Sequence, residues 1–185
     1  EGSSRGWANE QMPASLVELL LQRCETSFDH LAIIDSLTGN KLKWGQLLSQ
    51  SVAVAERIEA AGMTAGDRVL HIGPHSTAWP IVDFGCLLSG VVHVALHAEE
   101  SQSEQDRHLQ LFKPSGIVLS GGIRCRSLTQ QDLPLLEVQV NWSTDRIDRG
   151  SLRNSIAERL QRCDPDAPAA VLISSGTTGR PKGFV

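Results

Sequence analysis

The sequence predicts an α/β fold, a layered and mostly parallel sheet flanked by helices. Short apolar runs typical of strands alternate with longer segments whose apolar residues recur at helical spacing, from about residue 45 to the end of the chain. The last apolar run, 169–173, leads directly into a segment rich in Gly, Ser and Thr. Because strand–helix–strand series pair in parallel, helices are expected to cover the sheet.

The first elements are a helix and a hairpin. Ser15 and Glu18 have the spacing of a capping box, which predicts a helix over 15–24. Segments 31–34 and 41–44 flank a Thr-Gly-Asn turn and are predicted to pair as short strands.

The middle of the chain predicts the start of the sheet. The expected elements are helix 45–61, strand 66–72, helix 76–89 and strand 91–96. Gly62 is placed to end the first helix in a left-handed cap, and Pro80 is compatible with the second helix because it lies in its first turn. This series predicts parallel pairing of the two strands.

The remaining elements complete the layers. They are helix 101–112, strand 116–119, strand 137–140, helix 151–162 and strand 169–173. Ser101 and Glu104 form a second capping box, and Pro114 stops that helix. Segment 121–131 is expected to be a loop or a weak helix.

Composition narrows the class of protein. Hydrophobic residues make up 41% and charged residues 21%, as in globular domains, and the net charge of −4 without a basic run argues against nucleic acid as a partner. No signal peptide or membrane span is expected, and the localisation predicted is cytoplasmic. The cysteines are widely spaced, which predicts free thiols rather than disulfides or zinc ligands. They are Cys24, Cys86, Cys125 and Cys163. Residues 1–12 are expected to be a polar extension and 13–185 the folded part.

Two His-x-x-x-His pairs lie near the ends of predicted neighbouring strands, His71 with His75 and His93 with His97. A metal site is geometrically conceivable there, since parallel sheets bind ligands at this edge. No helical Glu and no carboxylate partner is evident for either pair, so no metal site is predicted.

Residues 173–183 read Ile-Ser-Ser-Gly-Thr-Thr-Gly-Arg-Pro-Lys-Gly. Glycines let the main chain approach a ligand, hydroxyls donate hydrogen bonds and Lys182 brings a positive charge, which together suit polyphosphate oxygens. The spacing is neither that of a Walker loop nor that of a dinucleotide fingerprint. A flexible linker is the competing interpretation, but it does not explain Pro181 and Lys182 in this register after a buried strand.

This segment resembles the signature of the adenylate-forming superfamily of acyl-CoA synthetases, luciferases and peptide-synthetase adenylation domains. The family signature Thr-Ser-Gly-Thr-Thr-Gly-x-Pro-Lys-Gly is matched except at Ser174. The resemblance implies catalytic roles for Lys182, Thr177 and Thr178 in stabilising the phosphates. It implies ATP contacts at Ser174, Ser175, Gly176, Thr177, Thr178, Gly179, Lys182 and Gly183.

The resemblance implies an enzyme that joins a carboxylic acid to AMP and then to a thiol, with ATP, Mg²⁺ and coenzyme A as cofactors. Segment 79–105 looks most like medium- to long-chain fatty-acyl-CoA synthetases, although Ala95 stands where relatives usually have proline. Two alternatives stay open: an amino- or aryl-acid adenylation domain, and a non-catalytic nucleotide-binding or assembly module.

The other catalytic parts of the family follow the phosphate segment in the chain. Residues 13–185 are therefore expected to be a partial AMP-binding domain, the N-terminal subdomain of an adenylate-forming enzyme, which pairs with the remainder of the enzyme. We expect these residues alone not to form an acyl-adenylate.

Overall fold

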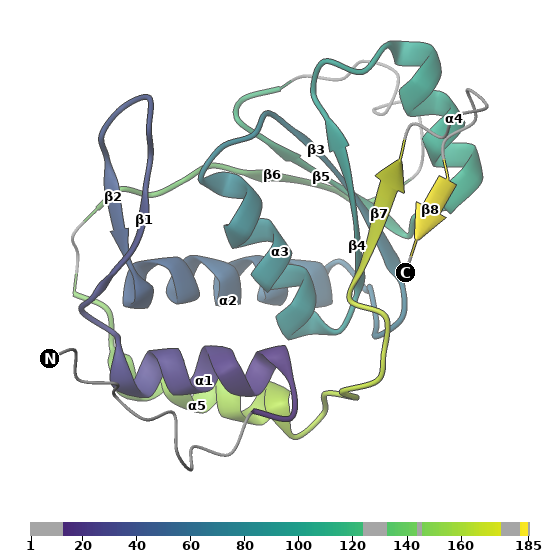
Figure 1. Ribbon diagram of the computed structural model, residues 1–185. Helices are drawn as coiled ribbons and strands as arrows, with labels where there is room; N and C mark the ends of the chain where they lie inside the picture. Colours follow the sequence, from purple (N-terminus) through teal and green to yellow (C-terminus); the bar gives the residue numbers. More distant parts are fainter. Residues whose placement is uncertain (1–12, 124–132, 144–145, 175–181, 185) are drawn as a thin grey trace, which may run out of the picture.

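The computed structural model describes residues 13–123, 133–143, 146–174 and 182–184, and it has the α/β architecture that the sequence predicts (Figure 1). The helices are α1 (Leu16–Thr26), α2 (Trp44–Ala60), α3 (Ala78–Ser89), α4 (Gln102–Phe112) and α5 (Arg149–Leu160). The strands are β1 (Leu31–Ile34), β2 (Lys41–Lys43), β3 (Arg68–Gly73), β4 (Val92–His97), β5 (Gly116–Ser120), β6 (Leu135–Val138), β7 (Ala170–Ser174) and β8 (Lys182–Phe184).

The main sheet has the strand order β6-β5-β3-β4-β7-β8. Its first five strands are parallel, and β8 pairs antiparallel with β7. The strands β1 and β2 form the expected antiparallel hairpin. The predicted parallel pairing is confirmed, and β3 lies at the centre because β4 and β5 flank it.

Alternate residues of β3 enter different hydrophobic clusters on the two faces of the sheet. Val69 packs with the apolar faces of α2 and α3, whereas Leu70 and Ile72 pack with Leu109 and Phe112 of α4. Helices α1 and α5 lie side by side beneath α2 and form a third cluster with it (Figure 1). The two helices that follow β3 and β4 therefore cover opposite faces of the sheet.

Several element boundaries follow from local chemistry as expected. Gly62, which follows the C-cap residue Ala61 of α2, has φ +84°, and Gly90 has φ +74° as the C-cap of α3. Glycine adopts this conformation without steric cost. At α4, the Ser101 hydroxyl accepts from the Glu104 N–H and the Glu104 carboxylate accepts from the Ser101 N–H, so this capping box is confirmed.

The first capping box differs in one bond. The Ser15 hydroxyl accepts from the Glu18 N–H at 3.1 Å, but the Glu18 carboxylate accepts from the N–H of Ala14 instead of Ser15. Helix α1 is still capped at the predicted residue.

Other boundaries are shifted. Strand β6 occupies Leu135–Val138 instead of 137–140, and α5 begins at Arg149 because the Asp148 side chain caps it by accepting from the Gly150 N–H. Strand β8 was not expected. The predictions for residues 1–12 and for most of 121–131 lie outside the described residues. Among the helices of the described part, none is long and apolar enough to cross a membrane.

Candidate functional site at the carboxyl edge of the sheet

The carboxyl ends of β3 and β4 form a topological switch point. These strands are neighbours in the sheet, and the chain leaves β3 for α3 on one face and β4 for α4 on the other. In open α/β sheets the two departing connections leave room for a ligand at this edge. The carboxyl ends of β5 and β7 lie at the same edge because both strands are parallel to β3 and β4.

The segment predicted to bind phosphate begins at this edge. Ser174 is the last residue of β7, and the backbone of Lys182 in β8 pairs with it, while Gly183 pairs with Ile173. The sequence predicted a loop through Lys182 and Gly183, and the structure instead places these two residues in a strand. The predicted contacts Ser175, Gly176, Thr177, Thr178 and Gly179 lie outside the described residues.

Three aromatic side chains gather after β3 and β4. The ring centroids of His75 and His97 are 4.7 Å apart, and those of His75 and Trp79 are also 4.7 Å apart. His75 and His97 therefore meet across the switch point, as expected for residues at the ends of adjacent strands.

A row of four polar side chains lies beneath this cluster, on the face that α3 covers. Asp83 Oδ1 of α3 is 2.7 Å from His93 Nδ1, His93 Nε2 is 3.0 Å from His71 Nδ1, and His71 Nε2 is 2.9 Å from the Ser120 hydroxyl. Each bond joins neighbouring elements, so the row runs from α3 through β4 and β3 to the carboxyl end of β5. Trp79 packs against both histidine rings.

Burial controls the charge of groups in this region. Desolvation, with a smaller contribution from the charge of His93, lowers the pKa of His71 from 6.5 to about 3. Burial also raises the pKa of the Cys86 thiol, with the Asp83 carboxylate adding to the effect. His71 and Cys86 are thus uncharged at neutral pH.

The histidines do not form a metal centre in the described part of the chain. No group of three or more His, Cys, Asp or Glu side chains is placed there to hold a metal ion. The nitrogens of His71 and His93 that face each other are hydrogen-bonded, so they are not free to act as ligands. The sequence showed no evident carboxylate partner for these histidines, but the structure supplies one, because Asp83 binds His93.

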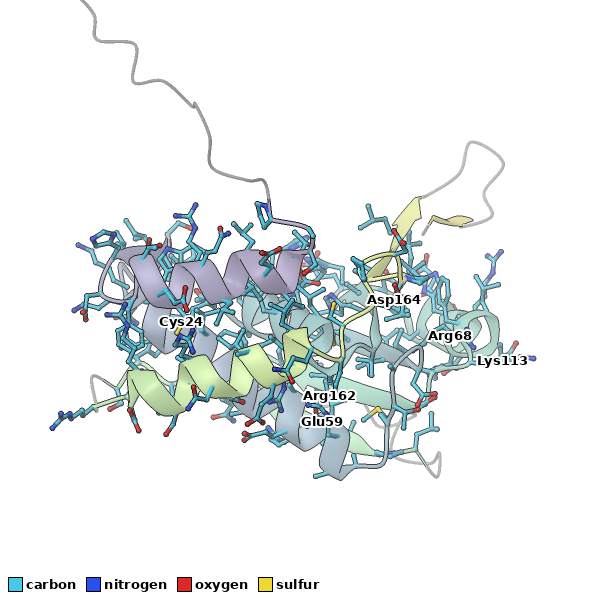
Figure 2. All side chains as sticks on the ribbon, turned by 90° about the horizontal axis from the view of Figure 1, so that it is seen from below. Cys24, Glu59, Arg68, Lys113, Arg162 and Asp164 are labelled. Carbon is cyan, nitrogen blue, oxygen red and sulfur yellow. The ribbon has the colours of Figure 1, made fainter. Side chains whose placement is uncertain are left out.

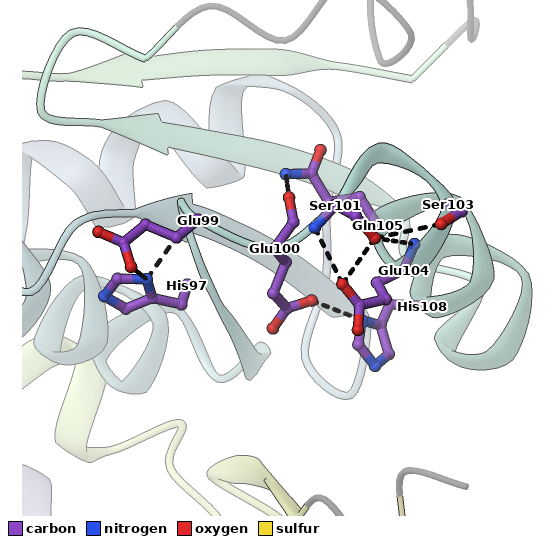
Figure 3. Close-up of polar contacts among 8 residues, drawn as sticks. All are labelled: His97, Glu99, Glu100, Ser101, Ser103, Glu104, Gln105 and His108. Atoms are coloured by element: carbon purple, nitrogen blue, oxygen red, sulfur yellow. Dashed lines mark hydrogen bonds and ion pairs between the residues drawn. The ribbon is translucent and has the colours of Figure 1, made fainter. Parts of the chain in front are cut away.

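The connection after β4 is held by short-range polar contacts (Figure 3). The Glu100 carboxylate lies 3.0 Å from Nδ1 of buried His108, an ion-pair distance, although the two atoms are not aligned as a hydrogen bond. The Gln105 side chain donates to the Glu100 carbonyl at 3.1 Å. These contacts fix the start of α4 relative to the end of β4.

A cavity of about 550 Å³ lies at the opposite, amino-terminal edge of the sheet, between the last turns of α2, α3 and α5. Glu59, Arg162 and Asp164, which line it, are labelled in Figure 2. Arg159 also lines it but is already bonded to Glu59 and Ser155. No predicted site residue lines this cavity, so its size does not make it the candidate site.

Sequence reasoning found the histidines but missed the row that they form. Asp83 and Ser120 are separated from His93 and His71 by 10 and 49 residues. Only the register of β3, β4 and β5 brings these side chains to one face. One signal was present in the sequence. His71 and Gly73 are two residues apart, so they lie on the same face of one strand, which indicates a close approach beside His71.

The sheet, its carboxyl edge and the segment after β7 first indicate a class of protein. Such an arrangement, with Gly, Ser, Thr and Lys after an inner strand, is typical of proteins that bind phosphates. Residues 20–185 match the family model described as AMP-binding enzyme, and the chain belongs to this family of ATP-dependent adenylating enzymes.

Individual relatives are similar over most of this chain. Phenyloxazoline synthase MbtB of Mycolicibacterium paratuberculosis is 34% identical over 142 residues, which cover 77% of this chain and 11% of that protein. Fatty acid–[acyl-carrier-protein] ligase ScoC of Streptomyces coeruleorubidus is 28% identical over 162 residues, covering 80% of this chain and 28% of that protein. The chain thus spans less than a third of the length of both relatives.

A solved structure shares the fold. The N-terminal domain of FACL13 from Mycobacterium tuberculosis superposes with a TM-score of 0.65 at 21% identity, over 91% of this chain and 43% of that one. The chain therefore has the fold of the N-terminal part of adenylate-forming enzymes.

Proposed function

We propose that the chain supplies the phosphate-binding part of an enzyme that activates a carboxylic acid with ATP. The observation that carries the proposal is the segment 174–183, which follows β7 at the carboxyl edge within a chain of the AMP-binding family. In this reaction the carboxylate attacks the α-phosphorus of ATP, an acyl-adenylate forms, and pyrophosphate leaves. Negative charge grows on the leaving pyrophosphate, so donors aimed at it lower the barrier.

Under this proposal Lys182, Thr177 and Thr178 stabilise that charge, and the glycines allow the backbone to approach the phosphates. The composition of the segment fits this role because hydroxyls, amide N–H groups and an ammonium are all donors to phosphate oxygen. Mg²⁺ bound with ATP would share the phosphate charge. It would be held mainly by the phosphates, since the segment itself contains no carboxylate.

For the acid and its acceptor we propose a medium- or long-chain fatty acid and coenzyme A in the cytoplasm, on the resemblance of segment 79–105 to fatty-acyl-CoA synthetases. An amino or aryl acid is the second candidate, since a relative at 34% identity is named phenyloxazoline synthase. Pyrophosphate exchange with a panel of fatty, aryl and amino acids, on a form of the protein that is active in the assay, separates the two candidates. Exchange that responds only to amino or aryl acids contradicts the fatty-acid proposal.

Calorimetric titration of the chain with Mg-ATP tests the phosphate role directly. Tripolyphosphate should compete, whereas adenosine should compete poorly, because the proposed contacts are all to phosphate. Lys182→Ala should weaken binding about ten-fold or more, as expected for a lost charged hydrogen bond. Lys41→Ala, an exposed lysine on β2, is the matched control and should not change binding.

Equal binding by the Lys182→Ala and Lys41→Ala variants would show that the segment does not hold the phosphates. Tight Mg-ATP binding without pyrophosphate exchange for any acid, in every form of the protein tested, would favour the non-catalytic module.

A further inference from the structure

With Asp83 ionised and His93 neutral, each side chain of the polar row has one donor or acceptor role in each bond. An ionised Asp83 only accepts, so His93 Nδ1 carries a proton and donates to it. A neutral His93 then has a bare Nε2, which accepts from Nδ1–H of His71. His71 Nε2 is bare in turn and accepts from the Ser120 hydroxyl. All three bonds point toward Asp83.

The surroundings of the row leave one favourable place for an extra positive charge. His93 adjoins Asp83, whose side chain is 51% exposed and carries the negative charge. His71 is fully buried, and within the described part of the chain its polar and ring contacts besides His93 are to Trp79 and Ser120, which are neutral. From α3, Cys86 also faces the sheet, and burial raises the pKa of its thiol, so it brings no charge. An added proton is therefore stabilised on His93 and not on His71.

We propose that Ser120, His71, His93 and Asp83 form a proton relay that takes up one proton and holds its charge on His93. In the protonated state His93 carries protons on both ring nitrogens, and its Nε2–H donates to His71 Nδ1. The His71 proton then lies on Nε2, where it donates to the Ser120 oxygen. The row gains one proton, no bond between heavy atoms changes, and the product is an imidazolium beside the Asp83 carboxylate.

The relay has a clear signature at its middle residue. His71 stays neutral throughout, but its proton moves from Nδ1 to Nε2 when His93 is charged. The Ser120 hydroxyl, which donates inward in the first state, is free to donate outward in the second. The protonation state of His93 therefore changes the hydrogen bonding of Ser120, two strands away at the end of β5. Gly73 begins the turn toward His75 at the same place.

Long-range ¹H–¹⁵N correlation spectra of the chain labelled at histidine test the proposal. At neutral pH both His71 and His93 should carry the proton on Nδ1. On acidification His93 should become doubly protonated, and His71 should change to the Nε2–H form at the same midpoint.

His93→Gln is the informative variant. Its amide oxygen can accept from His71 and its amide N–H can donate to Asp83, but it does not take up a proton, so the change at His71 should be lost. His75→Gln is the matched control, because His75 contacts Trp79 but lies outside the row, and it should leave the change intact.

Three results would overturn the relay: an Nε2–H form of His71 at neutral pH, a His71 that stays Nδ1–H while His93 titrates, or a change at His71 that persists in His93→Gln. The first two are observed in the unmodified chain, so the test stands even if the variant does not fold.

Discussion

At the scale of a single residue, His71 shows that a buried polar ring needs a hydrogen-bond partner for each of its nitrogens. Its side chain has no exposure, and both ring nitrogens find partners within 3.0 Å. Burying an imidazole without partners would cost a few kcal/mol. The two bonds remove most of that cost for the neutral ring, but they do not offset the desolvation of a buried positive charge, so His71 makes folding sensitive to acid.

We predict that His71 makes the folded chain less stable as the pH falls. Its pKa is lowered from 6.5 to about 3 in the folded state, so the unfolded chain binds more protons between these values. Below the unfolded pKa, this residue removes about 1.4 kcal/mol of stability per pH unit. The effect is absent above about pH 7, because His71 is then neutral in both the folded and the unfolded chain.

Urea unfolding at pH 7 and pH 5 measures this effect when His71→Gln is compared with the unmodified chain. The variant should lose less stability between the two pH values. Acidic groups such as Asp67, whose pKa hydrogen bonds from Thr64 and Ser115 lower, act in the same direction in both proteins and cancel in the difference. Equal losses in the two proteins would contradict the prediction.

Gly73 is required by the row rather than by backbone conformation. A Cβ atom at Gly73 would lie 2.0 Å from the Ser120 hydroxyl oxygen and 3.3 Å from His71 Nε2. Gly73→Ala should therefore destabilise the chain by about 1–3 kcal/mol, as overpacking usually does.

A double-mutant cycle identifies the cause. Adding Ser120→Ala removes the clashing oxygen, so the double variant should be more stable than the sum of the two single effects predicts. Thermal unfolding of all four proteins gives the coupling, and strict additivity would show that the close approach to Ser120 is not responsible.

At the scale of elements, the helix ends that adjacent residues set were predictable, although α5 lies two residues before its predicted range. The Ser101–Glu104 box, the glycines after α2 and α3, and the Pro80 position all depend on a few adjacent residues, and all occur as expected. Strand boundaries were less predictable, as β6 shows, because a strand ends where its neighbour stops pairing. Strand β8 was missed because its three residues pair only with β7.

We predict that Ser101→Ala destabilises the chain by about 1 kcal/mol, since the Ser101 hydroxyl caps the Glu104 N–H at the start of α4. Gln110→Ala, at an exposed position of the same helix, should change stability by less than about 0.5 kcal/mol. Chemical denaturation compares the two, and equal effects would argue against a role for the cap.

At the scale of the molecule, α5 is attached by two ion pairs of different character. Arg159 bonds Glu59 of α2 at 3.0 Å and its side chain is 7% exposed, whereas Arg153 bonds Glu25 of α1 at 2.6 Å with side chains 50% and 39% exposed. Burial makes the first pair costly to break, while water and salt screen the second.

We predict that Glu59→Ala destabilises the chain by about 2–4 kcal/mol, because it leaves the Arg159 charge buried without its carboxylate. Glu25→Ala, the matched surface change, should cost less than about 1 kcal/mol. Thermal unfolding at low and high salt checks both. A larger loss of stability for Glu25→Ala than for Glu59→Ala would contradict the prediction that the Arg159–Glu59 pair is the costlier one to break.

The sequence alone determined the parts of this protein that depend on neighbouring residues. Helical spacing, capping residues and apolar runs sufficed for the α/β class and the parallel pairing of strands, and the spacing within 173–183 sufficed for the family. These signals are local, so they survive without knowledge of the fold.

Only the tertiary structure decided which distant side chains meet. Asp83, His93, His71 and Ser120 come from four elements, and their order in the row is set by strand register and by the position of α3. Register depends on the packing of whole layers, since a shift by one residue would turn the two histidines toward the opposite face. That long-range requirement explains why the phosphate segment could be read from the chain and the polar row could not.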